Sequence, residues 1–552
     1  MFKPKILDNF KGYNKQQFTK DLLAGIIVGI VALPLAIAFG VASGVTPQQG
    51  LFTAIIAGFI ISALGGSRVQ IGGPTGAFIV IVYGIVQQFG INGLIIATFI
   101  AGILLIIMGL VRLGSVIKFI PHPLIVGFTT GIAVIIFSSQ IKDFLGLQMG
   151  AVPADFIDKW KAFALNISTI NPYSVFITIA TVLITVFWGK ISHKIPGPLV
   201  AIIITTAIVY FFPQHIETIG GKFGPISATF PSPVFPKLDW ATIQKLIRPA
   251  FTIALLGGIE SLLSAVVADG MTGGNHRSNT ELIAQGIANM FSALFGGIPA
   301  TGAIARTATN INNGGRTPVA GMIHAIVLFV ILFFIGKWAA LIPMATLAGI
   351  LIVVAYNMSE YRTFITITKV WSSDTAILLT TFLLTVLVDI TVAIEVGMIL
   401  AAFLFMRKMT KSSNVTNLTA QLYEAPDYED PNPISNYQIP ENITVYEING
   451  PLFFGAAYKF KDAIRVIEKK PRVLIIRMRY VPIIDATGSH ILEEVEKECK
   501  SSGIKLILSE IHSEQLMEEL QKTRLSFKIG KGNIVPTFKD AIIRSENIIA
   551  GR

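Results

Sequence analysis

Charged residues and cysteine are scarce in this chain of 552 residues. Asp, Glu, Lys and Arg together make up 14% of it, against roughly 25% in a typical soluble domain. The single cysteine, Cys499, excludes an internal disulfide and a cysteine-rich metal site. Hydrophobic residues, in contrast, account for 52% of the sequence, which indicates an integral membrane protein.

Long apolar runs recur between about residues 22 and 406 and predict a polytopic α-helical membrane protein. Many runs approach the roughly 20 residues that a helix needs to span a bilayer. The expected segments, some of half length, number 14 and begin near residues 22, 50, 74, 92, 122, 171, 198, 250, 280, 302, 317, 341, 372 and 391. The first 21 residues are polar and basic and lack a small-residue cleavage pattern, which predicts a retained anchor helix.

Basic residues at the ends of the apolar runs account for much of the net charge of +11. Lys3, Lys190, Arg316 and Lys411 are examples. With the segments counted above, these ends fall on one side of the membrane, and the positive-inside rule makes that side cytoplasmic. We therefore expect a multi-pass protein of the cell's inner (plasma) membrane, with both termini in the cytoplasm and no nucleic-acid partner.

Two of the expected segments, the third and the tenth, are too short to span the membrane as continuous helices. The third opens with "SALGGSRVQIGGPTGAF" (62–78) and the tenth with "SALFGGIPATGAI" (292–304), so similar letters recur in the same order. Each copy opens the third segment of a seven-segment half. Short segments interrupted by Gly and Pro at matching places in two halves indicate the binding site of an inverted-repeat transporter. The simpler alternative is a helix kink or turn.

Two facing half-helix starts favour a negatively charged solute. Their unpaired N–H groups and the positive ends of their dipoles point into the gap between them. Gly76 and Gly302 allow close approach, and Thr75 and Thr301 are expected to cap the free N–H groups. Arg306 would add a full positive charge. Alternatively, Arg306 is structural, either paired with an acid or directed to the cytoplasmic face.

The eighth segment, "FTIALLGGIESLLSAVVAD", carries Glu260 and Ser264 on one helical face, four residues apart. A carboxylate facing an anion site is unfavourable unless it carries a proton, binds a cation or pairs with Arg306. We therefore predict that Glu260 and Ser264 form a coupling site for H⁺ or Na⁺. A structural ion pair between Glu260 and Arg306 is the alternative. No other metal site and no cofactor are expected.

Beyond Lys411 the composition changes to a polar, acidic, proline-rich stretch and then to alternating strands and amphipathic helices, which predict a small cytoplasmic α/β domain. We divide the chain into an N-terminal cytoplasmic segment (1–21), a transmembrane domain (22–411), a linker leading into the last domain (412–440) and that domain (441–552). In "IIDATGSHILEEV", Thr487 follows a strand and is expected to cap the next helix, or to be a phosphorylation site.

Three runs carry a resemblance to a known family: "GGPTGAF", "GIESLLSAVVADGMTGGNHRSNTELIAQGIANMFSALFGGIPATGAIARTATN" and "IDATGSHILEE". Together they resemble the sulfate permease (SulP) family of anion transporters with its C-terminal STAS domain. The resemblance implies a seven-plus-seven inverted repeat of core and gate bundles, a homodimer, and elevator-like movement of the core. It places the anion between the third and tenth segments, at Thr75, Gly76, Ala77, Ala303, Ile304, Ala305 and Arg306.

Two positions depart from the family pattern. Glu260 falls where the sodium-coupled bicarbonate members carry Asp. This difference weakens the expectation of sodium coupling and favours proton coupling. Leu35 replaces the glutamine of a Pro-Gln pair found in many sulfate carriers. The sequence thus predicts a secondary active transporter of sulfate, bicarbonate or a dicarboxylate, coupled to H⁺ or Na⁺ and embedded among membrane lipids. An uncoupled anion exchanger or channel is the alternative, and no enzymatic activity is expected.

Overall fold

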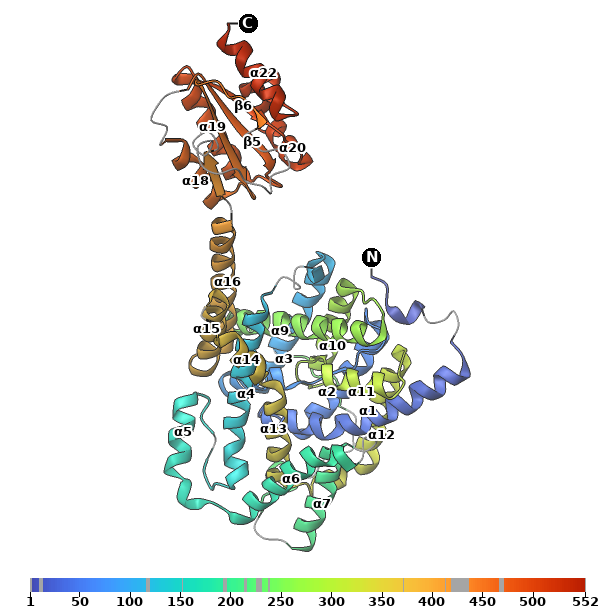
Figure 1. Ribbon diagram of the computed structural model, residues 1–552. Coiled ribbons are helices and arrows are strands. Elements are labelled where there is room, and N and C mark those ends of the chain that lie inside the picture. The colour runs from blue at the N-terminus through green and yellow to red at the C-terminus, as the bar shows by residue number, and fades with distance from the viewer. Residues whose placement is uncertain are drawn as a thin grey trace. The chain divides into compact units, whose positions relative to one another are not determined.

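The computed structural model describes residues 2–8, 13–115, 120–150, 152–191, 196–212, 216–224, 231–236, 239–370, 372–412, 414–417, 436–465 and 471–551. The chain divides into two compact units, Met1–Ala401 and Ala402–Arg552. The first unit is built almost entirely of helices, and the second combines a sheet with helices (Figure 1).

The helices of the first unit are α1 (Lys15–Ala42), α2 (Pro47–Leu64), α3 (Ile79–Leu110), α4 (His122–Leu145), α5 (Phe156–Leu165), α6 (Pro172–Ile191), α7 (Gly197–Phe211), α8 (Ile219–Phe223), α9 (Trp240–Thr272), α10 (Ser278–Leu294), α11 (Ile304–Asn312), α12 (Pro318–Ala339), α13 (Met344–Met358), α14 (Tyr361–Thr368) and α15 (Ser373–Leu387). Helix α16 (Ile390–Ser412) leads into the second unit. Among the described residues, 8 spans are long and apolar enough to cross a membrane, and three shorter apolar helices accompany them.

The structure modifies several of the expected segments. Those expected near residues 74 and 92 form one run, η2 (Gly76–Phe78) followed by α3, which breaks at Gly90 with a φ of 66°. Helix α9 begins at Trp240, about ten residues earlier than predicted, because Asp239 caps it and the helix continues through Pro249. The amphipathic helix α5 was not expected, since it is too short and too charged to resemble a membrane span.

Two short strands bring the Gly/Pro-rich segments of the two halves together. Strand β1 (Gly72–Gly73) pairs antiparallel with β2 (Thr301–Gly302). The backbone then continues from β1 into η2 and from β2 into α11. Helix α11 has nine residues and rises roughly 14 Å, about half of a bilayer core. The two similar sequence stretches therefore meet as antiparallel neighbours, each opening a helix.

The second unit contains a five-stranded sheet in the order β3-β4-β5-β6-β7. Its strands are β3 (Asn414–Asn417), β4 (Ile443–Asn449), β5 (Val473–Tyr480), β6 (Lys505–Ser509) and β7 (Ile534–Val535), and its helices are α18 (Phe454–Arg465), α19 (Ala486–Ser501), α20 (Glu514–Lys522), α21 (Leu525–Ile529) and α22 (Phe538–Ile549). Strands β4 to β7 are parallel, and β3 is antiparallel to β4. Their apolar side chains form one core on each face, and α22 packs into one of these cores.

The predicted linker includes strand β3, which joins this sheet, while residues 413 and 418–435 lie outside the described residues. The prediction that Thr487 caps the next helix is wrong. Helix α19 begins at Ala486, and the Asp485 side chain accepts a hydrogen bond of 2.7 Å from the Gly488 amide. A carboxylate that directly precedes the helix takes the capping role. Phosphorylation of Thr487 stays a prediction.

Candidate functional site

The guanidinium of Arg306 lies at the junction of the two half-helices. Arg306 is the third residue of α11, and its side chain is 2% exposed. Its Nη2 donates a hydrogen bond to the carbonyl of Pro74, between β1 and η2. Its Nη1 has no hydrogen-bond partner among the described residues. A Cβ atom added to Gly73 would lie 2.5 Å from that Nη1, so glycine at this position makes room for the guanidinium.

The starts of both half-helices lack side-chain caps. Thr75 precedes η2 and Ala303 precedes α11, and neither side chain bonds to the N–H groups that follow it. Among the described residues, the first amides of each half-helix therefore receive no cap from the side chain that precedes them. Thr75 and Ile304 are accessible to solvent, Ile304 to 43%, whereas Gly76, Ala77 and Ala303 are buried.

The predicted capping role of Thr75 and Thr301 is wrong, because helix α9 engages both hydroxyls. Thr75 Oγ1 donates to Glu260 Oε2 at 2.9 Å. Thr301 Oγ1 donates to the Gly257 carbonyl at 2.9 Å and lies 2.8 Å from Ser261 Oγ. Helix α9 thus presents one polar face to both half-helices, and its side chains compete successfully for these hydroxyls.

Glu260 and Ser264 share this face but bond to different partners. Glu260 accepts from Thr75 of the first half, whereas Ser264 Oγ lies 3.3 Å from Thr307 Oγ1 of α11. Glu260 is partly exposed and Ser264 is buried. The ion pairs among the described residues do not include Glu260 with Arg306. The structural pairing considered as an alternative from the sequence is therefore not observed in this conformation.

Several polar residues near the site were missed by the sequence reasoning. Ser261 Oγ accepts from the Gly302 amide at 3.0 Å and so fixes the end of β2. Thr307 Oγ1 accepts from the Ile71 amide at 3.0 Å. Gln70 is 4% exposed, and its side chain lies so close to Gly302 that no Cβ would fit there. The helical spacing from Gly257 to Ser261 is a signal that could have identified Ser261.

Family comparisons match two regions of this chain. Residues 18–381 match the sulfate permease family, and residues 435–541 match the STAS domain. The chain is 43% identical over 524 residues to YvdB of Bacillus subtilis, whose name assigns it provisionally to sulfate transport, with 95% of this chain and 97% of that protein covered. It is 34% identical to the bicarbonate transporter BicA of Picosynechococcus, covering 79% of each chain.

Two solved structures share the fold. The murine anion transporter Slc26a9, in its inward-facing state, matches with a TM-score of 0.87 at 18% identity, over 98% of this chain and 93% of that one. The transmembrane domain of a cyanobacterial BicA matches with a TM-score of 0.64 at 33% identity, over 69% of this chain and 98% of that one. These matches confirm the predicted fold class, a helical membrane protein with a separate α/β STAS domain. The relatives are named transporters, which agrees with the expectation that the chain is not an enzyme.

Proposed function

The chain belongs to the sulfate permease family, and from this premise we propose that it is a secondary active transporter of a small anion. Sulfate, bicarbonate and a dicarboxylate are the candidate substrates. The names of two relatives, one assigned to sulfate and one to bicarbonate, support the first two. The transported anion, H⁺ or Na⁺ and the surrounding lipids are the partners of this function.

The observation that carries the proposal is the state of Arg306. Its guanidinium is buried, has no carboxylate partner among the described ion pairs, and keeps Nη1 unbonded beside two uncapped helix starts. A buried cation without a counter-ion is unfavourable. An anion between Thr75–Ala77 and Ala303–Arg306 would supply that counter-ion and would accept hydrogen bonds from the free amides.

Coupling is assigned to Glu260. Its carboxylate lies beside the first half-helix and bonds to Thr75, so its charge and the anion act on the same segment. A proton on Glu260 would remove the repulsion between the two. Sodium would need oxygens from both Glu260 and Ser264, and in this structure the two side chains bond to different half-helices, at Thr75 and at Thr307. The contacts therefore favour H⁺ over Na⁺.

The remaining features follow the family pattern. We propose that the core carrying the half-helices moves as an elevator against the gate helices of a homodimer. Both termini lie in the cytoplasm, and the protein resides in the plasma (inner) membrane. The STAS domain supports dimerisation and regulation. An uncoupled exchanger or channel on the same scaffold is the second candidate, and the coupling experiment separates it from the first.

The experiment measures uptake into proteoliposomes. Labelled sulfate, bicarbonate and fumarate are offered separately, each with an inward proton gradient, an inward sodium gradient or neither. Accumulation of one anion driven by one gradient is the expected result, and it would identify both transported species. Downhill flux that depends on neither gradient would contradict coupled transport and would favour an uncoupled exchanger or channel.

A further inference from the structure

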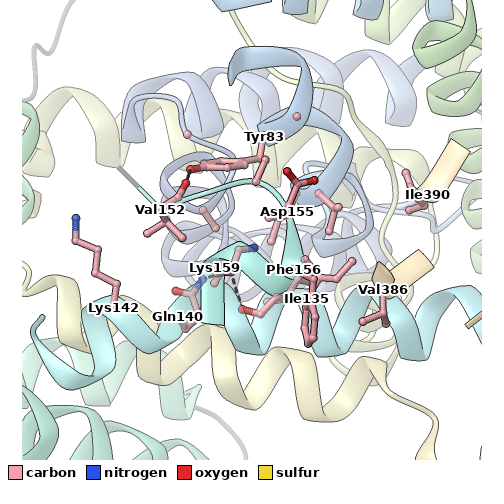
Figure 2. Close-up of a pocket in the computed structure, with 18 of the residues that line it drawn as sticks. Tyr83, Ile135, Gln140, Lys142, Val152, Asp155, Phe156, Lys159, Val386 and Ile390 are labelled. Atoms are coloured by element: carbon pink, nitrogen blue, oxygen red, sulfur yellow. Dashed lines mark hydrogen bonds between the residues drawn. The ribbon is translucent and has the colours of Figure 1, made fainter. Parts of the chain in front are cut away.

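A cavity of about 520 Å³ adjoins the half-helix site, since its lining residue Ile136 lies 3.6 Å from a Cβ built on Gly76. The cavity is lined by the C-terminal end of α1, the first turns of α3, the C-terminal half of α4, helices α5 and α8, the loop before α5, and the segment between α15 and α16. Figure 2 shows Lys159, Asp155, Tyr83 and Gln140 around it. None of the seven residues proposed to bind the anion lines this cavity, although Ile79 at the start of α3 does.

The cavity lies on one face of the membrane region. Helix α1 begins at Lys15, near the N-terminus, and its other end, at Val41 and Ala42, lines the cavity. Because α1 is long enough to cross the bilayer, the cavity lies on the side opposite the N-terminus. With the cytoplasmic termini proposed above, this side is extracellular.

Most of the charged side chains that line the cavity are already engaged. Lys142 Nζ donates to the carbonyls of Met149 and Gly150, both at 3.0 Å. Lys222 lies 3.8 Å from Asp143. Asp389 accepts from the Thr391 amide at 2.6 Å, at the start of α16. These groups hold the walls of the cavity together.

Lys159 is different, because its ammonium has no hydrogen bond and no ion pair within 4 Å in the part of the chain that the structure describes. The residue is 3% exposed and lies on α5, which lines the cavity through Phe156 and Lys159. Burial lowers the pKa of Lys159, and the carboxylate of Asp155, one helical turn earlier, opposes that shift. Asp155 is exposed, so water and salt screen its charge more than they screen the charge of Lys159.

The loop between α4 and α5 lines one side of the cavity. Tyr83 of α3 donates to the Val152 carbonyl at 2.7 Å, and Lys142 holds the preceding turn. This loop and α5 therefore shield Lys159 from bulk solvent. In this less polar surrounding, the attraction of Lys159 for an anion is stronger than at an open surface.

We propose that this cavity is a second anion-binding site, in which Lys159 captures the anion on the extracellular side before the anion reaches the half-helices. The inference rests on the proposed function. An anion beside Lys159 supplies the counter-ion that the buried ammonium lacks, and the wall next to it continues through Ile79 to the start of α3. The site takes a small anion, because Lys159 is the lining cation that has neither a hydrogen bond nor an ion pair within the described part of the chain.

The test uses the chain's single native cysteine. Cys499 is buried, and burial raises the pKa of its thiol to about 12, so it reacts slowly at neutral pH. Lys159→Cys then introduces one thiol that lines the cavity, which small reagents can enter. In right-side-out vesicles, the variant should show about a tenfold higher KM for extracellular sulfate or bicarbonate, with maximal rate retained, because a charged hydrogen-bond donor is lost.

Chemical restoration of the charge makes the test specific. Aminoethyl methanethiosulfonate adds an ammonium to the new thiol and should return the KM towards that of the wild type, whereas the sulfonatoethyl reagent should not. Lys161→Cys is the matched control, since Lys161 lies on the same helix, has a side chain 70% exposed and pairs with Asp158 at 3.2 Å. Neither reagent should change the KM of that control.

Different results would contradict the second anion-binding site and the transport function on which it rests. If the wild-type protein transports an anion but Lys159→Cys and Lys159→Met leave its extracellular KM unchanged, Lys159 is not a binding residue. An equal change in the KM for transport from the extracellular side and from the cytoplasmic side would also exclude an extracellular capture site. If the wild-type protein moves none of the tested anions, the proposed function fails and this site fails with it.

Discussion

The hydroxyl of Thr75 donates a hydrogen bond to the carboxylate of Glu260 across 2.9 Å, although the two residues are 185 positions apart in the sequence. Thr75 precedes the first half-helix, and Glu260 lies in the middle of α9. A change in the charge of Glu260 therefore acts directly on the segment proposed to bind the anion. This contact gives a physical basis for linking the anion to a second ion.

Glu260→Gln should abolish gradient-driven accumulation while downhill exchange persists. The amide oxygen can still accept the hydrogen bond from Thr75, but the side chain can no longer carry or release a proton. The measurement compares uptake under an imposed proton gradient with exchange of labelled for unlabelled anion. Asp374→Asn, at an exposed acid on α15, is the control. Accumulation that survives Glu260→Gln would exclude the coupling role.

Arg306→Gln should weaken anion binding roughly 10- to 100-fold, because a hydrogen bond to a charged group contributes about 1.5–3 kcal/mol. Arg306→Lys should be intermediate, since lysine keeps the charge but not the fork that reaches the Pro74 carbonyl. The affinity is measured as the KM of uptake. Arg362→Gln, at an exposed arginine, serves as the control. Unchanged affinity in folded Arg306→Gln would remove Arg306 from the site.

Gly73→Ala should reduce anion affinity without any change of charge. The new Cβ would lie 2.5 Å from Arg306 Nη1, and the φ of 150° at this residue disfavours side chains. The backbone strain alone costs on the order of 1–3 kcal/mol. Gly189→Ala in α6 is the matched control, because nothing lies within 4 Å of its Cβ position and it does not line the cavity. Equal effects of the two changes on KM would show that the position of Arg306 does not limit binding.

Glu510→Gln should destabilise the STAS domain by about 3–5 kcal/mol, since it breaks a buried ion pair. Arg477 is fully buried, with Nε 2.6 Å from Glu510 and Nη1 3.6 Å from Glu447. The rate at which Cys499 reacts with a thiol reagent reports opening of the domain, and we expect an increase of roughly a hundredfold or more. Glu518→Gln, in an exposed pair with Lys522, should change the rate little.

The stability of the STAS domain should depend on pH through Cys499. The folded pKa of Cys499 is raised by burial to about 12, above its ordinary value of 9.0. The unfolded chain therefore loses this proton first as the pH rises. The contribution of Cys499 to stability is present below pH 9 and declines between about pH 9 and pH 12. Cys499→Ser should remove this part of the pH dependence in thermal unfolding.

Much of the architecture could be predicted from the sequence because it depends on local composition. The length of each apolar run determines whether it can span a bilayer, and Gly and Pro interrupt the two segments that form half-helices. The helix start at Trp240 was missed because the polar residues before Pro249 resemble a loop, although Asp239 supplies a cap. Helix α5 was missed because its amphipathic pattern covers only ten residues.

By itself, the sequence determined the membrane-spanning class, the two half-helices, the presence of Arg306 and Glu260 near them, and the family. Only the tertiary structure decided which groups these residues meet: Arg306 meets the Pro74 carbonyl, and Glu260 meets Thr75. It also decided that Lys159 lies in a cavity rather than on a solvated helix face. The reason is physical. Hydrophobic burial in a membrane follows local composition, whereas the partner of a buried polar group is chosen by competition among segments that only the folded chain brings together.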